Sequence, residues 1–420
     1  MRRAFRLTAL WITLLFVMQP AQAQMDAIRE DFIRYGFARY QGCDMHLLPS
    51  GREKMADMLR SIENARFFVH VEYYKLWNDS TGRVFLDALA RCAQRGVKVR
   101  VVYDAFGNSG KAPNVTKEFV EGYRKRGVMM YGFDPMRFPY INHALHRLHR
   151  KMVIVDGVMV YTGGMNIADY YINGRPKIGE WRDMHARLTG PIVDGYQKLF
   201  AGMWQQITRE RLDSMAYSMQ GCRTYMDESI ADDLKSRGSE AFIVDRKPGR
   251  ESKAIRQSYI SCLDHARKRV RILNPYIILT GSVRKALRRT IERGVELEIL
   301  LSHKGDHAIS ETSTAREVYS LARRGAKVWL YDGGFHHDKI MIVDDTLCTV
   351  GTANLDARSL AFDYEVNAYY FSPLMCRELN AYYEKEIEGS TLLTRENWKT
   401  MYTRKQRRMG WWLKGLRGIL

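Results

Sequence analysis

Two segments of this sequence carry the same polar residues at the same spacing. Residues 148–166 (LHRKMVIVDGVMVYTGGMN) align without a gap with residues 336–354 (HHDKIMIVDDTLCTVGTAN). Both fit the pattern H-x-K-x4-D-x6-G-x2-N, at a constant offset of 188 residues. The paired residues are His149 and His337, Lys151 and Lys339, Asp156 and Asp344, Gly163 and Gly351, and Asn166 and Asn354. One copy could arise by chance in a basic protein, but two copies in register indicate a shared function.

The paired residues suit the chemistry of a phosphodiester. Each His-x-Lys leads into an apolar run that predicts a buried strand, on which residues i and i+2 share a face. If the two halves pack about a pseudo-twofold axis, both pairs meet in one cleft. Lysines and asparagine amides then neutralise phosphate oxygens in the transition state. One neutral imidazole can attack phosphorus, while the other, protonated imidazole donates a proton to the leaving alkoxide. This chemistry requires neither a metal nor a cofactor.

Four acidic residues accompany the two copies. A nucleophilic histidine needs an acceptor on its second nitrogen, and Asp183 and Glu365 lie in strand-like stretches of matching order downstream. The alternative for these two is a surface salt bridge. Asp156 and Asp344 complete the motif, but alternation along the strand turns them away from the lysines. We therefore assign them a structural role at the strand end.

The repetition extends beyond the motif and predicts the fold. SIENARFFVHVEYY (61–74) resembles CLDHARKRVRILNPYI (262–277), and two further helix–glycine–strand stretches match at an offset of 198, at Gly96/Gly294 and Gly127/Gly325. Glycine at the end of a helical pattern is a C-cap signal. A duplicated strand–helix–strand–helix–strand unit follows, which predicts a mixed, largely parallel sheet flanked by helices in each half. We expect two α/β/α sandwich domains with the active site at their interface.

The N-terminus and the charge indicate an exported protein with an anionic partner. Residues 1–23 combine three arginines, an apolar stretch and Ala-Gln-Ala, as in a cleaved export signal; the alternative is an uncleaved anchor. Cleavage would remove only those arginines and lower the net charge from +19 to +16. Such a charge attracts nucleic acid, anionic lipid or polyphosphate. Six scattered cysteines lack a CxxC pair, which argues against a zinc site, and their spacing identifies no disulfide.

The motif residues and their surroundings resemble the phospholipase D superfamily, whose defining feature is a doubled H-x-K-x4-D. The chain is similar to the bacterial cardiolipin synthase branch over residues 45–420. The matching stretches include YDAFGN (103–108), TGGMNIADYY (162–171), GEWRDMHARLTGPIV (179–193), NPYI (274–277) and GTANLDARSLAFDYEVN (351–367). Two departures from the family pattern are Asp338, where a small residue is usual, and His336, where leucine is usual.

The resemblance implies an enzyme that transfers phosphatidyl from one phosphatidylglycerol to another and releases glycerol. His149 would be the nucleophile and His337 the general acid and then base, although the residues leave either histidine as a candidate nucleophile. Lys151, Lys339 and the two motif asparagines would hold the phosphate. The orienting acids would come from the opposite half, so that Glu365 serves His149 and Asp183 serves His337.

We divide the chain into an export signal (1–23), two phospholipase D-like domains (24–218 and 219–395) and a basic C-terminal segment (396–420). Residues 401–420 carry six basic and no acidic residues beside two tryptophans, which is typical of a segment that lies in an anionic membrane interface. The alternatives are a packed helix or a tail. These features place the enzyme at the periplasmic face of the inner membrane.

The competing functions are an exported nuclease, a hydrolytic phospholipase D and a lipid-binding protein with an inactive site. The doubled motif and the C-terminal segment disfavour nucleic acid as the substrate. Phosphatidylethanolamine stays open as the second substrate, and the sequence carries no signal for an oligomeric state.

Overall fold

The computed structural model describes residues 24–109, 114–135, 146–213, 216–218, 228–249, 253–305 and 308–407. The predicted export signal at residues 1–23 and residues 408–420 of the predicted membrane segment lie outside the described residues. Among the described helices, none combines the length and apolar character needed to cross a bilayer.

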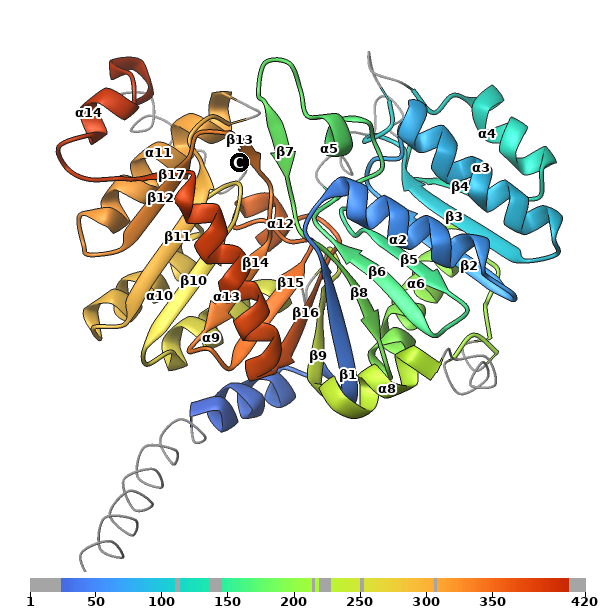
Figure 1. Ribbon diagram of the computed structural model, residues 1–420, viewed down its shortest axis with the longest axis horizontal. Coiled ribbons are helices and arrows are strands. Elements are labelled where there is room, and N and C mark those ends of the chain that lie inside the picture. The colour runs from blue at the N-terminus through green and yellow to red at the C-terminus, as the bar shows by residue number, and fades with distance from the viewer. Residues whose placement is uncertain are drawn as a thin grey trace, which may run out of the picture.

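Each half of the chain contains the predicted strand–helix–strand–helix–strand unit (Figure 1). The elements of the first half are β1 (Ala38–Leu48), α2 (Gly51–Glu63), β2 (Phe68–Tyr73), α3 (Ser80–Gln94), β3 (Lys98–Asp104), α4 (Lys117–Lys125), β4 (Met129–Phe133), β5 (Met152–Val155), β6 (Met159–Gly163), α5 (Tyr170–Asn173), β7 (Glu180–Arg182), β8 (His185–Thr189) and α6 (Ile192–Thr208). The repeated unit is β2–α3–β3–α4–β4. Gly96 and Gly127 adopt positive φ values of 91° and 90° directly after α3 and α4, as the C-cap prediction requires.

The second half repeats this order after helix α8 (Glu228–Arg237). Its elements are β9 (Ser239–Arg246), α9 (Ala254–His265), β10 (Arg269–Leu273), α10 (Gly281–Glu292), β11 (Glu296–Ser302), α11 (Ala308–Ala322), β12 (Lys327–Tyr331), β13 (Gly334–His336), β14 (Ile340–Val343), β15 (Leu347–Gly351), α12 (Ala357–Ala361), β16 (Glu365–Phe371), α13 (Pro373–Glu388), β17 (Ser390–Leu392) and α14 (Trp398–Met401). The repeated unit here is β10–α10–β11–α11–β12.

The strands form one continuous sheet rather than two separate ones. The order of its 15 described strands is β17-β12-β11-β10-β14-β15-β16-β9-β1-β8-β6-β5-β2-β3-β4. The antiparallel pair of β9 and β1 joins the two halves, with Ala38 opposite Ile243. Figure 1 shows this junction near the lower centre of the molecule. The fold class is confirmed, with the refinement that the two sandwiches share a sheet.

The prediction of a largely parallel sheet was wrong. Within the described 15-stranded sheet, only β2–β3–β4 and β10–β11–β12 pair in parallel, through the helical crossovers that the repeats predicted. The motif strands instead form antiparallel hairpins, β5–β6 and β14–β15, closed by short turns. A three-residue turn cannot reach the far end of a strand, so no parallel pairing is available there. The helix-containing repeats that led to the prediction of a parallel sheet do not include these hairpins. A separate two-stranded sheet pairs β7 with β13 in parallel.

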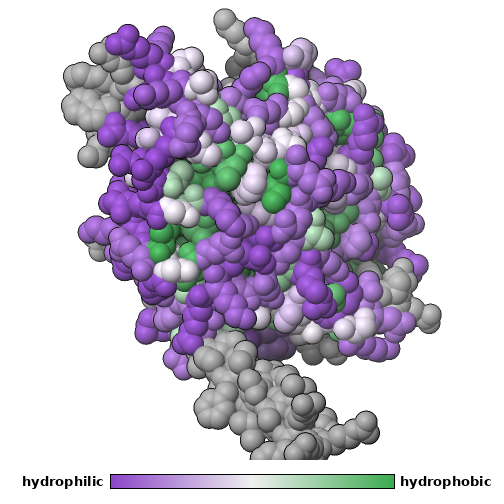
Figure 2. Space-filling view, turned by 60° about the vertical axis from the view of Figure 1, so that its left-hand side comes forward, coloured by the Kyte–Doolittle hydropathy of each residue, from purple (hydrophilic) through white to green (hydrophobic). Residues whose placement is uncertain are grey.

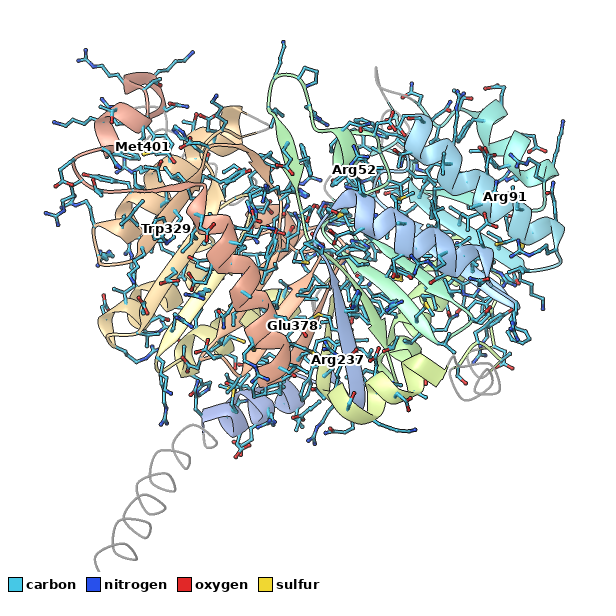
Figure 3. All side chains as sticks on the ribbon, in the orientation of Figure 1. Arg52, Arg91, Arg237, Trp329, Glu378 and Met401 are labelled. Carbon is cyan, nitrogen blue, oxygen red and sulfur yellow. The ribbon has the colours of Figure 1, made fainter. Side chains whose placement is uncertain are left out.

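Three buried apolar clusters hold the layers together. One packs α2, α3 and α4 against the first half of the sheet, and another packs α9, α10 and α11 against the second half. The third lies on the opposite face and contains residues of both α6 and α13, including Phe200 and Tyr383. Because this cluster also includes strands from both halves, a single core fixes the two repeats against each other. Arg237 on α8 adds a contact between the halves, because it pairs with Asp44 on β1 at 3.0 Å and with Glu378 on α13 at 2.9 Å (Figure 3).

Candidate active site

Both His-x-Lys segments are extended stretches that immediately precede the motif strands. His149 and Lys151 lie before β5, and His337 and Lys339 lie before β14. Each segment is held by the other half of the molecule. The amide of His149 donates to the carbonyl of Tyr364 at 3.1 Å, and the amide of His337 donates to the carbonyl of Arg182 at 2.7 Å. This exchange of backbone hydrogen bonds brings the two motif copies to one interface.

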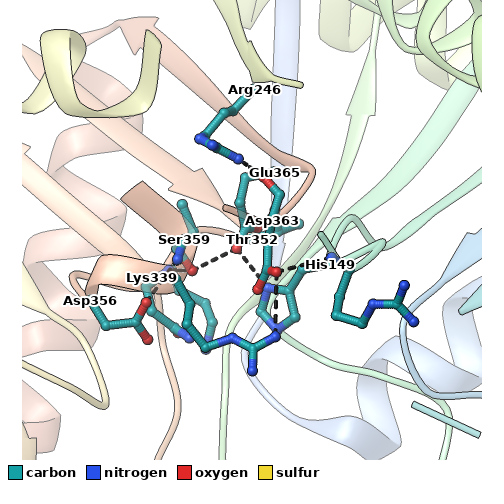
Figure 4. Close-up of polar contacts among 12 residues, drawn as sticks. His149, Arg246, Lys339, Thr352, Asp356, Ser359, Asp363 and Glu365 are labelled. Atoms are coloured by element: carbon teal, nitrogen blue, oxygen red, sulfur yellow. Dashed lines mark hydrogen bonds and ion pairs between the residues drawn. The ribbon is translucent and has the colours of Figure 1, made fainter. Parts of the chain in front are cut away.

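Each motif histidine forms a hydrogen bond to an acid of the opposite half. His149 Nδ1 lies 2.7 Å from Glu365 Oε1, and His337 Nδ1 lies 2.6 Å from Asp183 Oδ2. Figure 4 shows the first of these pairs. The crossed pairing is the one that the resemblance implied. Because Nδ1 of each ring is engaged by a carboxyl group, Nε2 is the nitrogen left for substrate.

The two acids differ in how their oxygen atoms are satisfied. Glu365 accepts hydrogen bonds from the hydroxyl groups of Ser359, at 2.6 Å, and Thr352, as Figure 4 shows. Asp183 Oδ1, in contrast, has no hydrogen-bond partner among the described residues. The residue equivalent to Thr352 in the first half is Gly164, and a Cβ atom there would lie 2.0 Å from Asp183 Oδ1. The first half therefore provides space for Asp183 where the second half provides a hydroxyl donor.

Burial shifts the pKa values of both acids upward. It raises the pKa of Glu365 to about 7, opposed by the Lys151 ammonium and by the two hydroxyl donors. It raises the pKa of Asp183 well above its usual range, opposed chiefly by Lys339. Burial and the neighbouring lysines lower the pKa values of both His149 and His337 well below the ordinary value. The site therefore favours neutral imidazole rings.

The two motif lysines lie beneath the histidines and are almost completely buried. The ammonium groups of Lys151 and Lys339 donate to the carbonyls of His149 and His337. Burial lowers the pKa of Lys151 to about 7 and that of Lys339 to about 8, although nearby carboxylates oppose this shift. Each lysine thus stabilises the backbone of its own His-x-Lys segment and adds positive charge near the histidine rings.

A cavity of about 210 Å³ opens above the histidines. Its lining residues are Tyr74, Lys75, His149, Asn166, Tyr170, Tyr171, Trp181, Tyr276, His337, Asn354, Asp356, Arg358 and Asp363. Asn166 is fixed, since its side-chain amide donates to Tyr171 at 2.8 Å and its Oδ1 accepts from the amide of Lys75 at 3.0 Å. Asn354 Oδ1 has no hydrogen-bond partner among the described residues. The side chain of Asn354 is therefore available to a ligand.

Asp156 and Asp344 do not line this cavity. Asp156 lies at the β5–β6 turn with a positive φ of 50° and accepts from the backbone amides of Arg66, Phe67 and Phe68 at 2.8–2.9 Å. Asp344 occupies the equivalent turn with a φ of 49° and accepts from the amides of residues 267–269 at 2.7–2.8 Å. Both aspartates thus tie a hairpin turn to the start of the adjacent strand.

His336 and Asp338 form a buried cluster of their own beside the site. His336 Nε2 lies 2.9 Å from Glu386 Oε2, and its Nδ1 contacts Asp338. These two carboxylates outweigh the effect of burial and raise the pKa of His336 to about 9. Asp338 also accepts from the hydroxyl of Tyr382 at 3.3 Å. The unusual Asp338 is thus satisfied by the equally unusual His336.

Several cavity residues received no role from the sequence. Arg358 forms an ion pair with Asp363 at 3.4 Å, and Asp363 in turn accepts from the amide of Arg147 at 3.1 Å. Trp181 packs 5.3 Å from the His337 ring. Arg358 and Asp363 fall inside the family stretch 351–367, which was the only available signal. Most of the aromatic lining residues also fall inside stretches that resemble the family, but tyrosine and tryptophan in apolar patterns are most often core residues, so they were given no role.

No group of three or more His, Cys, Asp or Glu side chains within the described ranges is arranged to hold a metal ion. The five described cysteines, Cys43, Cys92, Cys262, Cys348 and Cys376, are buried and unpaired.

Comparison with known proteins identifies the family. Residues 58–204 and 259–389 match the model of the family described as cardiolipin synthase, PLD-like domain. The chain belongs to this family. It is 32% identical over 379 residues to a cardiolipin synthase of Staphylococcus aureus (strain Mu50 / ATCC 700699), covering 90% of this chain and 72% of that one. It is also 33% identical to the major cardiolipin synthase ClsA of Bacillus subtilis (strain 168), over 84% of this chain and 70% of that one.

Solved structures support the fold. The phosphatidylserine synthase of Haemophilus influenzae Rd KW20 superposes with a TM-score of 0.66 at 16% sequence identity, covering 90% of this chain and 95% of that one. The polyphosphate kinase of Porphyromonas gingivalis superposes with a TM-score of 0.55 at 13% identity, covering 90% of this chain and 54% of that one. At these identities the likeness concerns the architecture alone.

Proposed function

We propose that this protein is a cardiolipin synthase that transfers the phosphatidyl group of one phosphatidylglycerol to another and releases glycerol. The observation that carries the proposal is the crossed pair of hydrogen bonds, in which His149 contacts Glu365 and His337 contacts Asp183. Two oriented imidazoles at one cavity supply the nucleophile and the proton donor that a double displacement at phosphorus needs. Family membership supports the lipid substrate.

The different surroundings of the two acids support His149 as the nucleophile and His337 as the proton donor. The hydroxyl groups of Ser359 and Thr352 stabilise the carboxylate form of Glu365, which accepts the Nδ1 proton of His149. His149 Nε2 then carries a free lone pair. Asp183 Oδ1 lacks such donors and burial raises the pKa of Asp183, which together favour a protonated carboxyl group whose hydroxyl donates a hydrogen bond to His337 Nδ1. His337 then carries its own proton on Nε2, which faces the cavity.

The reaction proceeds in two displacements. His149 Nε2 attacks the phosphorus of the first phosphatidylglycerol, and the bond from phosphorus to the glycerol headgroup oxygen breaks. His337 Nε2–H protonates the leaving glycerol while Asp183 passes its proton to His337 Nδ1, so that the ring stays neutral. A hydroxyl of the second phosphatidylglycerol then attacks the phosphatidyl-histidine and gives its proton to His337 Nε2, Nδ1 returns its proton to Asp183, and His149 is released. The positive charges of Lys151 and Lys339 stabilise both pentacoordinate transition states. Asn166 and Asn354 contact the phosphate oxygens from opposite sides of the cavity.

We propose that the enzyme acts at the periplasmic face of the inner membrane. Residues 1–23 have the pattern of an export signal, which would bring the enzyme to the periplasmic face of the inner membrane. Figure 2 shows that most of the surface on the side of the second half is hydrophilic, with hydrophobic residues in small separate groups. This surface suits a peripheral protein held by electrostatic attraction to anionic lipid.

Product analysis tests the proposal. Purified full-length protein is incubated with phosphatidylglycerol vesicles, and lipids and free glycerol are measured together. The proposal predicts equal amounts of cardiolipin and glycerol. Phosphatidic acid without cardiolipin would show hydrolysis instead, and unchanged lipid with degraded DNA would show a nuclease. Adding phosphatidylethanolamine to the vesicles shows whether it competes as the second substrate.

A further inference from the structure

A second and larger cavity lies away from the histidines, between helix α11 and the segment that contains α14. Its volume is about 650 Å³. Its lining residues are Arg316, Tyr319, Ser320, Arg323, Arg324, Trp398 and Arg407, which we call the arginine pocket. Among the described residues, the lining contains four guanidinium groups and no carboxylate. A pocket of this size and charge suits an anionic headgroup.

The arginines of this pocket are scarcely neutralised by the protein. Arg324 reaches Glu292 only at 3.9 Å, and both side chains are largely exposed. Arg407 donates to the carbonyls of Lys399 and Tyr402 rather than to an acid. Within the described residues, neither Arg316 nor Arg323 forms an ion pair. Like charges held this close repel one another, so an anion bound between them would be stabilised.

The floor of the arginine pocket is rigid and aromatic. The rings of Tyr319 and Trp398 stack at 4.2 Å with an interplanar angle of 7°, and Trp398 also packs 4.8 Å from Tyr402. Trp398 and Tyr402 are buried, so this stack holds the C-terminal segment against α11. Tryptophan and tyrosine beside basic side chains are typical of protein surfaces that contact lipid headgroups.

A cavity beside the corresponding helix of the first half lacks the positive charge of the arginine pocket. Helix α4 corresponds to α11, since each precedes the last strand of its repeat. The cavity beside α4 has a volume of about 590 Å³, and its charged lining residues are Lys117, Glu118, Glu121 and Arg124. Two acids balance two bases there. Of these two cavities, the arginine pocket carries a net positive charge and the cavity beside α4 does not.

The arginine pocket lies towards the same end of the molecule as the active site. Figure 1 shows α11 and α14 at the upper left and the β7–β13 pair at the upper centre, and Figure 3 places Met401 in the same upper region. The carbonyl of Met401 lies 2.8 Å from His303 Nε2. The preceding residue, Ser302, accepts from the amide of His336, next to the catalytic His337. A membrane that meets the catalytic end would thus also meet the arginine pocket.

We infer that the arginine pocket is an exosite for the phosphate group of an anionic phospholipid in the bilayer, separate from the lipid undergoing reaction. The bound headgroup anchors the enzyme with its catalytic end towards the membrane. This inference does not rest on the proposed reaction, because binding can be measured in protein that cannot turn over.

The test is sedimentation with phosphatidylcholine vesicles, with and without phosphatidylglycerol, in the full chain carrying His149→Ala. The pocket variant is Arg323→Gln/Arg324→Gln, which alters two exposed side chains in the turn that follows α11. The matched control is Arg34→Gln/Lys235→Gln, which removes the same charge from two exposed side chains, 68% and 77% accessible, near the opposite end. Each basic residue at an anionic surface contributes about fivefold in affinity, so we expect about 25-fold weaker binding for the pocket variant.

Three results would overturn the inference. The first is equal binding of the pocket variant and the control to vesicles with phosphatidylglycerol. The second is loss of binding to a DNA oligonucleotide with unchanged vesicle binding, which would assign the pocket to nucleic acid. The third is unchanged vesicle binding of the pocket variant together with weaker binding of inorganic phosphate in solution than in the control, which would assign the pocket to soluble phosphate. In the active protein, the pocket variant should raise the apparent KM for vesicles and leave kcat unchanged.

Discussion

Replacing Glu365 by glutamine tests how the structure activates His149. The substitution keeps the size of the side chain and an oxygen that can accept the Nδ1 proton, but it removes the charge. The hydrogen bond of 2.7 Å to His149 changes from a charged to a neutral one. Ser359 continues to donate to the same oxygen, while the hydroxyl of Thr352 can rotate to accept from the new amide. Tautomer and geometry are therefore retained, and the electrostatic contribution alone is lost.

The expected loss follows from the strength of that hydrogen bond. A hydrogen bond to a charged group contributes about 1.5–3 kcal/mol. If this contribution is realised when positive charge develops on His149 during attack, kcat falls by about 10- to 150-fold. The carboxylate also raises the pKa of Lys151. Its removal lowers that pKa further, so the ammonium form is lost at lower pH and the basic limb of the rate profile moves to lower pH.

The assay is cardiolipin formation in phosphatidylglycerol vesicles across pH 5–9, with thermal unfolding measured in parallel. Glu386→Gln is a matched control, because Glu386 is a buried carboxylate on the neighbouring His336, which has no catalytic role. It should change stability but not the pH profile. A kcat for Glu365→Gln within a factor of two of the unaltered enzyme would refute the reasoning.

Three further predictions follow from the described contacts. Asp156→Ala leaves three backbone amides without their acceptor and should cost about 3 kcal/mol or more of unfolding free energy, measured by urea denaturation, with kcat per folded molecule retained. Activity should fall above about pH 8, where Lys151 and Lys339 lose their protons, and a flat profile to pH 10 would exclude the ammonium groups from catalysis. In the unfolded chain Lys339 stays protonated up to the ordinary pKa of a lysine, whereas in the folded chain the pKa of Lys339 is about 8. The stability difference between the unaltered protein and Lys339→Met should therefore rise between these limits by up to about 1.4 kcal/mol per pH unit, measured by denaturation in pH 8–10 buffers.

The sequence predicted most of the site because the site is duplicated. Two copies of the motif in register identified His149 and His337, and the downstream acids followed from the same repeat. Because side chains alternate between the two faces of a strand, Asp156 was expected to point away from Lys151 and to have a structural role. The turn geometry at Asp156 agrees with that expectation. These predictions rest on local spacing, which the chain encodes directly.

Features that depend on contacts between distant segments were beyond the sequence. The β1–β9 pair that fuses the halves joins strands about 200 residues apart, and neither strand belongs to the repeats that were compared. The aromatic walls of the cavity come from several loops of both halves. The unequal support of Glu365 and Asp183 depends on Thr352 facing a carboxylate where the first half has Gly164. A threonine and a glycine carry no chemical signal until their neighbours are known.

Trapping the covalent intermediate tests the central claim most directly. Phosphatidylglycerol labelled with ³²P at its phosphate is mixed with protein carrying His337→Ala and quenched in alkali, which preserves phosphohistidine. Mass spectrometry then locates the label. The mechanism predicts a phosphorylated histidine at His149, formed by this variant and absent from His149→Ala. Cardiolipin synthesis by the unaltered enzyme without any protein-bound label, or label that persists in His149→Ala, would contradict it.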